Sequence, residues 1–430
     1  MNTESRIEII PSPRRLINSL RDLGYDTVSA VADIVDNSIE AGATKVVIDV
    51  KIDGRESSIR IADNGRGMSP DTLQEAMRYG TEREYDPSAL GKFGLGLKTA
   101  SQSQCREFVV ASRANVKANT CAFAWDMEHV EKTNKWEIIR LTPQDIGGTL
   151  RGPIQGITGT VVLWKKLDRV LGYKNPDGTW AERNLLSLCR SLEKHLAMVF
   201  HRFISGEERG KRLNIFLNDN KIEPWDPFVR GEKRTKKFPP SIFKFNDGAM
   251  IGNVMLEPFV LPHKDKFSSP DAFKKASGPK NWNQQQGFYI YRAGRMIQSG
   301  GWSGLRTVDE HTKLARVALH FTPVLDDAFK INVAKMHAEL PHQLQEQIKS
   351  AVNAAVKIAQ KAYRAKESSG KVVSGGQSGN LSKRPPATPL KMWTFDEVAS
   401  ILRSSARGAE IPVIDRIIKR VRKTFRGKTR

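Results

Sequence analysis

Three short segments near the N-terminus constrain this 430-residue chain more than any other feature. They are Asp33–Asn37, Asp63–Met68 and Gly91–Thr99. The first carries carboxylates and an amide, the second is an acidic turn rich in glycine, and the third is a loop of glycine and lysine. Carboxylate and amide oxygens can hold Mg²⁺, a buried Asp can bond a base edge, and a glycine loop with Lys can approach phosphates. In this order the segments predict a site for a nucleoside triphosphate and its metal.

The first segment lies in a predicted helix from Thr27 to Ala41. Asp26 is a suitable residue to cap its start, and Gly42 to end it. Apolar residues recur at helical spacing, so the polar residues Asp33, Asn37 and Glu40 are expected on another face, with Asp33 and Asn37 one turn apart.

The rest of the first part alternates between strand and helix patterns. A short helix is expected from Pro13 to Leu23 and another from Asp71 to Tyr79, and Gly80–Gly96 is interpreted as a lid loop. The expected strands are Lys45–Ile52, Ser58–Ala62, Arg106–Arg113, Cys121–Asp126, Trp136–Leu141 and Gly159–Lys165. This pattern predicts an α+β fold, a two-layer sandwich of helices on a sheet.

A second α+β domain is expected after a long helix from Ala181 to Phe203. Its predicted strands are Arg212–Leu217, Ala249–Phe259, Gly287–Arg292 and Ala315–Phe321, and a helix at Pro341–Lys366 closes it. A Ser/Gly/Pro-rich stretch then predicts a flexible linker, followed by two amphipathic helices. The predicted boundaries are 1–170, 171–366, 367–390 for the linker and 391–430 for the basic helical tail.

Charge is distributed unevenly along the chain. From Lys361 onward there are 17 Lys and Arg against 5 Asp and Glu, a net charge of +12 out of a total of +22. A basic tail is attracted to nucleic acid or another polyanion, although it can also serve only to keep the chain in solution.

Two absences in the sequence bear on where the chain works. Three scattered cysteines do not provide a disulfide framework or a zinc site. No apolar run is long enough to cross a membrane, and charges stand where a signal peptide would be apolar. We therefore expect a cytoplasmic protein without a membrane partner.

The three motifs together resemble those of the GHKL ATPases, which include gyrase, the large heat-shock chaperones, histidine kinases and MutL, and they are most similar to the MORC and MutL-like branch. The family's Glu-x-x-x-Asn stands here as Asp33–Asn37, and its Asp-x-Gly-x-Gly as Asp63–Gly67. The loop Gly91–Lys98 is similar to the MORC version, and Gly159–Thr160 matches the final Gly-Thr pair. The resemblance implies a Bergerat-type ATP-binding domain followed by a transducer-like domain.

The resemblance also implies a role for each matching residue. Asn37 would give its amide oxygen to Mg²⁺, and Asp63 would accept a hydrogen bond from the adenine amine. Gly65 and Gly67 would let the backbone approach the purine, with Met68 on the base and Thr160 reaching it through water. The phosphates would meet the glycine loop with its flanking lysines, namely Lys92, Gly94, Leu95, Gly96, Leu97 and Lys98.

A lysine from the second domain would complete the phosphate site if the transducer resemblance holds. Lys335 is the best positional match and Lys330 is the second candidate. The first His is His129, after the nucleotide motifs, so the layout disfavours histidine-kinase chemistry, which needs a phospho-accepting His ahead of them.

Asp33 departs from the family pattern, in which a Glu polarises the attacking water. Asp is one methylene shorter, so its carboxylate reaches roughly 1.2–1.5 Å less far, and a base must lie within hydrogen-bond reach of its water. Three interpretations remain open: slow hydrolysis through a shifted water, a site that only binds, or a backbone shift that compensates. We favour slow hydrolysis.

Two functions are consistent with these motifs and this charge distribution. The first is an ATP-operated clamp that forms a homodimer on ATP binding and acts on DNA or a DNA-associated complex, with bacterial defence or repair as the setting suggested by resemblance. The alternative is a nucleotide-sensing scaffold with negligible turnover, whose C-terminal helices dock a partner enzyme. A chaperone acting on protein clients lacks support, because no acidic linker or large client domain follows.

Overall fold

The computed structural model describes residues 9–22, 25–80, 96–172, 176–208, 212–248, 250–331, 338–364 and 415. By its contacts the chain divides into two units, Met1–Gly370 and Lys371–Arg430. The predicted linker at 367–390 and the basic helices of 391–430 lie outside the described residues, apart from Asp415. The helices and strands given below all belong to the first unit.

The first sheet has eight strands in the order β5-β4-β3-β6-β2-β1-β7-β8. Neighbouring strands are antiparallel except β1 and β7, which are parallel. The strands are β1 Lys45–Lys51, β2 Ser58–Asp63, β3 Glu107–Arg113, β4 Cys121–Asp126, β5 Ile139–Arg140, β6 Gly159–Lys165, β7 Asn214–Leu217 and β8 Asn220–Lys221.

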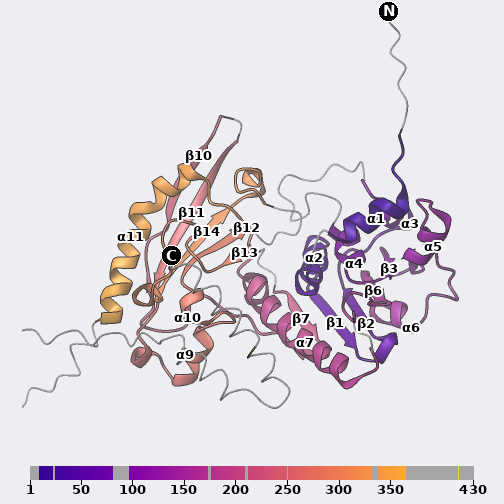
Figure 1. The fold of residues 1–430 in the computed structure, drawn as a ribbon, viewed down its shortest axis with the longest axis horizontal. Coiled ribbons are helices and arrows are strands. Elements are labelled where there is room, and N and C mark those ends of the chain that lie inside the picture. Colours follow the sequence, from indigo (N-terminus) through magenta and orange to yellow (C-terminus); the bar gives the residue numbers. More distant parts are fainter. Residues whose placement is uncertain are drawn as a thin grey trace, which may run out of the picture. The chain divides into compact units, whose positions relative to one another are not determined.

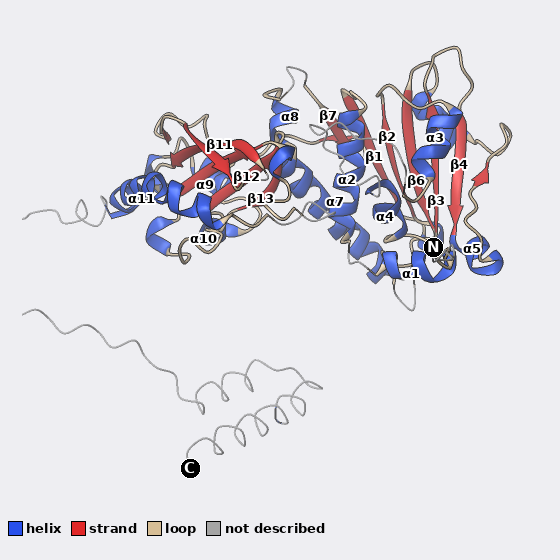
Figure 2. Ribbon diagram, turned by 90° about the horizontal axis from the view of Figure 1, so that it is seen from above, coloured by secondary structure: helices blue, strands red, loops and turns tan. Residues whose placement is uncertain are grey.

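Helices cover one face of this sheet (Figures 1 and 2). They are α1 Pro13–Arg21, α2 Thr27–Glu40, α3 Pro70–Met77, α4 Gly96–Gln102, α5 Met127–Thr133, α7 Thr179–Val199 and α8 His201–Ser205. The short helix α6 Gly148–Arg151 lies on the opposite face. Alternate strand residues such as Ile61 and Trp164 join α2 and α7 in one core. Their neighbours, such as Ala62, form a smaller cluster on the opposite face with Leu150 of α6. This period-two division is what the alternating sequence predicts.

The second sheet follows the order β10-β11-β14-β12-β13, with β9 paired to β11. Its strands are β9 Lys236–Lys237, β10 Ser241–Asn246, β11 Ile251–Val260, β12 Gly287–Arg292, β13 Arg295–Ser299 and β14 Ala315–Phe321. The helices of this part are α9 Pro270–Ala276, α10 Asn281–Gln284 and α11 His342–Arg364. A separate core joins the sheet to one side of α11, where Leu344, Ile348 and Val352 are fully buried.

The predicted α+β architecture is confirmed, with three local corrections. The strand predicted at Arg212–Leu217 for the second domain belongs to the first sheet, because β7 pairs in parallel with β1. The strand predicted at Trp136–Leu141 shrinks to Ile139–Arg140. The helix predicted as Ala181–Phe203 is broken at Phe200, whose backbone leaves the helical region.

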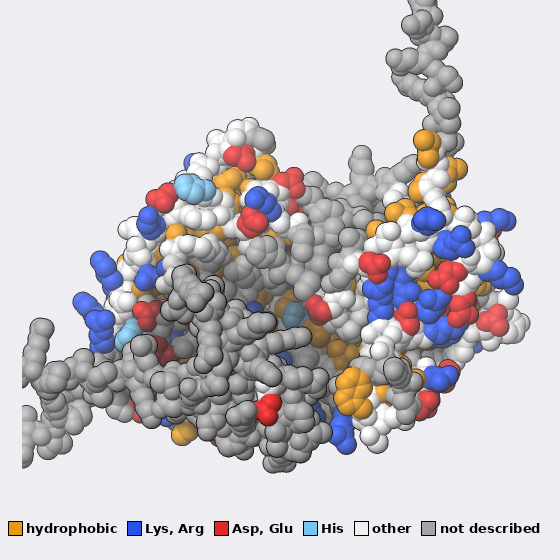
Figure 3. All heavy atoms as spheres, in the orientation of Figure 1, with side chains coloured by type: hydrophobic (Ala, Val, Ile, Leu, Met, Phe, Trp, Pro, Cys, Tyr) orange, Lys and Arg blue, Asp and Glu red, His pale blue; other side chains and the backbone are white. Residues whose placement is uncertain are grey.

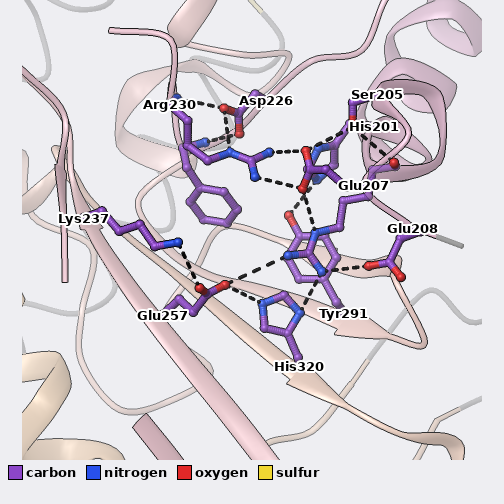
Figure 4. A network of polar contacts seen from close by, with 12 residues as sticks. His201, Ser205, Glu207, Glu208, Asp226, Arg230, Lys237, Glu257, Tyr291 and His320 are labelled. Atoms are coloured by element: carbon purple, nitrogen blue, oxygen red, sulfur yellow. Dashed lines mark hydrogen bonds and ion pairs between the residues drawn. The ribbon is translucent and has the colours of Figure 1, made fainter. Parts of the chain in front are cut away.

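A polar network joins α8 to the second sheet (Figure 4). His201 shares a hydrogen bond of 2.8 Å with the Tyr291 hydroxyl. The guanidinium of Arg202 lies 4.6 Å from the Tyr291 ring centroid, and it donates to Glu208 and His320 at 3.1 Å each. The chain that leaves α7 is therefore fixed directly to β12 and β14.

Candidate active site

Helix α2 carries the first group of candidate residues, and its start is fixed as predicted. The Asp26 side chain accepts the backbone N–H of Ser29, which satisfies a donor that the first turn leaves open. Within the helix, Asp33 and Asp36 are buried at 2% and 1% exposure, whereas Asn37 is exposed. Asn37 makes no side-chain hydrogen bond to any residue that the structure describes. Its amide is therefore available to a ligand.

Asp33, the candidate base, is enclosed by residues from three directions. The Tyr25 hydroxyl donates to its Oδ2 at 2.8 Å, and Nη2 of Arg295 lies 3.8 Å from its Oδ1. Gly96, where the glycine loop enters α4, also comes close, since a Cβ built there would lie 3.7 Å from Asp33 Oδ2. Burial, together with the Asp33 carboxylate, raises the pKa of Tyr25, so this hydroxyl keeps its proton and remains a donor.

Asp63 stands at the end of β2, where the chain turns back over α2. Its Oδ1 accepts the N–H of Gly65 at 2.8 Å, and its Oδ2 accepts the hydroxyl of Ser38 at 3.0 Å. Burial raises the pKa of the Asp63 carboxyl, while these two hydrogen bonds favour its charged form. A carboxylate fixed at both oxygens in this way is oriented before any ligand arrives.

The turn after Asp63 requires glycine because the backbone of β3 passes very close. Gly67 has φ +66°, and a Cβ there would lie 2.0 Å from the carbonyl oxygen of Arg113. The next residue, Met68, donates its N–H to the Ser112 hydroxyl at 2.8 Å, and that hydroxyl is 2.9 Å from the hydroxyl of Thr160. Thr160 is the strand partner of Asp63. These contacts bring Met68, Thr160 and Asp63 together at the end of β2.

Lys98 is buried at the start of α4 and has an unexpected set of partners. Its Nζ donates to the carbonyl oxygens of Ala76 and Arg78, at 3.0 and 2.7 Å, near the end of α3. Burial lowers the pKa of Lys98 to about 8. In this structure Lys98 therefore links α4 to the end of α3 by hydrogen bonds.

The remaining phosphate-site candidates divide between described and undescribed positions. Gly96 and Leu97 open α4, whereas Lys92, Gly94, Leu95 and Lys335 lie outside the described residues. Lys330 is described, and its Nζ pairs with Glu339 at 2.6 Å on the exposed surface. This ion pair does not favour Lys330 as a phosphate ligand.

Sequence reasoning missed four residues that shape this site, namely Tyr25, Ser38, Ser112 and Arg295. The hydroxyl residues carry no sequence signal, because Ser and Tyr are common at such positions. Arg295 does carry one, since it is a charged residue directly before the apolar residues Met296 and Ile297 of β13. Its partner could not be predicted, because Asp36 lies 259 positions away in the chain.

Comparison with known proteins identifies this domain. Residues 25–157 match the family described as histidine kinase-, DNA gyrase B-, and HSP90-like ATPase. This domain belongs to the GHKL superfamily. Within the superfamily it falls in the MORC and MutL-like branch, because its curated relatives include the following MORC and MutL proteins.

Protein MICRORCHIDIA 6 of Arabidopsis thaliana is 33% identical over 89 residues, which make up 20% of this chain and 13% of that protein. The DNA mismatch repair protein MutL of Aquifex aeolicus is 28% identical over 112 residues, 25% of this chain and 26% of that protein. MutL of Azorhizobium caulinodans is 48% identical over 71 residues, 16% of this chain and 11% of its own length. The matches to these GHKL proteins thus span a small part of each.

Among the described residues, no cluster of three or more His, Cys, Asp or Glu side chains could hold a metal ion. None of the described helices is long and apolar enough to span a membrane.

Proposed function

We propose that this chain is an ATP-operated molecular clamp of the MutL/MORC-like type. It binds ATP with Mg²⁺, hydrolyses it slowly, forms a homodimer while ATP is bound, and acts on DNA or a DNA-associated complex. One observation carries the proposal: the oriented carboxylate of Asp63 stands at the end of β2, beside the helix that exposes the free amide of Asn37.

Asp63 is suited to reading adenine. A carboxylate oxygen can accept more than one hydrogen bond, so each oxygen retains acceptor capacity beyond its bond to Gly65 or Ser38. That capacity would be used by the exocyclic amine of adenine. Because Gly67 has no Cβ, the turn can lie directly against the backbone of β3, and we propose that this holds Met68 and Thr160 beside the purine.

The donor set around Asn37 fits a magnesium ion held mainly by phosphates. Mg²⁺ prefers oxygen ligands and keeps several waters, so it is commonly bound by one or two protein oxygens plus substrate phosphates. Asn37 supplies one such oxygen, and the metal when bound would neutralise phosphate charge. We propose that Lys98 exchanges its carbonyl partners for phosphate, joined by Lys92 and the glycine loop and by Lys335 from the second domain.

Slow hydrolysis follows from the surroundings of Asp33. A general base must reach its water by a hydrogen bond, and here one oxygen of a short side chain already accepts from Tyr25. The carboxylate lies next to Gly96, the first residue of α4, but it must be partly released before it can orient water.

The alternative, a nucleotide-sensing scaffold with negligible turnover, is favoured by the same enclosure. Asp33 is only 2% exposed and lies between Tyr25 and Arg295. If ATP does not open this arrangement, the site would bind without hydrolysing, and residues 391–430 would pass the signal to a partner protein.

Charge supports DNA as the client, as the name of the relative MutL also suggests. A cavity of about 610 Å³ lies beside the end of α11, and its lining includes no Asp or Glu. Five cations border it, and none forms an ion pair with a residue that the structure describes: Lys233, Arg234, Lys236, Lys266 and Lys361. Figure 3 shows Lys and Arg side chains along the side of the molecule on which Figure 1 draws α11. A DNA backbone would neutralise such a group. Defence or repair in a cytoplasmic setting would suit such a clamp.

The test of the function is ATP turnover with and without duplex DNA. Wild type should hydrolyse ATP slowly, Asp33→Ala should lose that activity, and Asp33→Glu should keep or raise it because the longer side chain reaches further. Turnover that is unchanged in Asp33→Ala would remove the assigned base. ATP binding without any wild-type turnover would establish the scaffold instead.

A further inference from the structure

A buried arginine from the second sheet reaches into helix α2. Arg295 begins β13 and is 2% exposed, so its charge is withdrawn almost completely from water. Its guanidinium lies 5.9 Å from the ring centroid of Phe200, at the break between α7 and α8. An unpaired guanidinium would be very unfavourable at such a position, so its carboxylate partners fix where it stands.

Those partners are the two buried carboxylates of α2. Nε of Arg295 donates to Asp36 Oδ1 at 2.9 Å and lies 2.7 Å from its Oδ2, while Nη2 is 3.8 Å from Asp33 Oδ1. Asp33 and Asp36 are three positions apart and therefore neighbours on the helix. A guanidinium placed between two buried carboxylates is attracted to both and fixes their positions relative to β13.

We propose that Arg295 is the positioning residue through which the second domain controls the candidate base Asp33, using Asp36 as its anchor. This inference rests on the proposed ATPase function. Arg295 and the Tyr25 hydroxyl contact the two oxygens of Asp33, so a displacement of β13 moves the carboxylate that orients water. ATP binding at α2 and rearrangement of the second domain are thereby coupled through one side chain.

A pH profile of kcat can distinguish the positioning role of Arg295 from a purely stabilising one, provided that the other titratable groups facing Arg295 and Asp33 are known. They come from α2 (Asp36), from the segment before it (Tyr25) and from α7 (His195). Burial, and then the charge of Arg295, lower the pKa of His195 to about 4. His195 could therefore contribute to an acidic limb, and pH profiles are to be repeated in a His195→Gln background.

A matched control lies on the same hairpin. Arg292 of β12 is also buried, and it pairs with Asp326 at 2.7 and 2.8 Å within the second domain. Arg295→Lys and Arg292→Lys each keep a charge and each break a buried two-point pairing. For Arg295→Lys we expect kcat to fall about tenfold or more with KM for ATP nearly unchanged, because a misplaced catalytic group affects turnover more than binding. The acidic limb of kcat should also move to higher pH. Arg292→Lys should lose about as much thermal stability as Arg295→Lys. It should nevertheless keep the wild-type kcat and the wild-type acidic limb of the pH profile.

Asp36→Asn should reproduce the Arg295→Lys phenotype, and kcat of the double variant should be no lower than that of either single variant.

A second measurement does not depend on hydrolysis. ATP with Mg²⁺ should change amide hydrogen exchange across residues 287–299 in wild type and in Arg292→Lys, but not in Arg295→Lys. Wild-type kcat in Arg295→Lys, or equal effects of both lysine variants, would overturn the proposal. If wild type binds ATP without turnover, hydrolysis fails as a function while the exchange experiment still decides the coupling.

Discussion

At the scale of residues, the turn after β2 is where the backbone itself restricts the sequence. Gly67 combines a left-handed conformation with a carbonyl oxygen of β3 2.0 Å from any Cβ. Gly80, at the start of the loop, has nearly the same φ of +67°, but nothing lies within 4 Å of its Cβ position. The two glycines separate the effect of conformation from the effect of close approach.

Gly67→Ala should destabilise the protein by about 2–4 kcal/mol, since the clash with the β3 backbone adds to the unfavourable φ. Gly80→Ala should lower stability by only about 1 kcal/mol, from conformation alone. Urea unfolding of both variants measures the difference. Equal losses would show that the close approach at Gly67 is unimportant.

Asp63→Asn should weaken ATP binding by about 10- to 100-fold, the usual worth of a hydrogen bond to a charged group. The fold should survive, because Asn keeps an oxygen that can accept from Gly65. Isothermal titration with ATP measures this, with Asp271→Asn, at an exposed carboxylate in the first turn of α9, as the matched control. Wild-type affinity in Asp63→Asn would exclude this carboxylate from adenine recognition.

At the scale of elements, the sequence predicts the features that a local pattern determines, such as the bounds of a strand. It does not predict features that depend on pairing with a distant segment. The predicted bounds of β6, β12 and β14 match the structure, because alternating apolar residues mark a strand wherever it pairs. The sheet that accepts β7 could not be predicted, since four residues of strand carry no information about a partner 169 positions away. The same holds for the site: α2 and the Asp63 turn are local motifs, whereas the Arg295 contact is made only by the tertiary fold.

The network around α8 predicts how stability responds to acid (Figure 4). Burial lowers the pKa of His201 to about 3, well below its unfolded value near 6.5. As pH falls below about 6.5, His201 is protonated in the unfolded chain but stays neutral in the folded chain. The free energy of unfolding therefore decreases with falling pH, down to the folded pKa. Between pH 6.5 and 5 this site alone should remove about 2 kcal/mol.

His201→Gln should flatten that dependence, because Gln has nothing to titrate and can still bond the Tyr291 hydroxyl. Urea unfolding of wild type and variant at pH 7 and pH 5 tests it. A variant that loses as much stability on acidification as wild type would show that His201 does not titrate on unfolding.

At the scale of the whole molecule, charge is the property that reaches beyond the nucleotide site. Of the total +22, the residues before Lys361 carry +10, and five cations border the cavity beside α11, which ends at Arg364. A nucleic acid bound there would release counterions, which makes its affinity depend steeply on salt.

Replacing Lys236, Lys266 and Lys361 together with Ala should lower duplex affinity and reduce the slope of log affinity against log salt by about 2–3, near 0.9 for each lost phosphate contact. The control replaces Lys117, Lys132 and Lys221, which are exposed elsewhere and carry the same total charge. Fluorescence anisotropy with a labelled duplex at several salt concentrations measures both. An identical slope in the two triple variants would place the DNA contact elsewhere, with the tail as the next candidate.

The central claim is that α2, the Asp63 turn and the glycine loop form one adenine-nucleotide site completed by the second domain. A crystal structure with Mg²⁺ and a non-hydrolysable ATP analogue tests it most directly. We predict the adenine amine on Asp63, the metal on Asn37, Lys98 and Lys335 against the phosphates, and Asp33 facing the γ-phosphate. A nucleotide bound away from Asp63 and Asn37, or phosphates without a lysine from the second domain, would contradict the account.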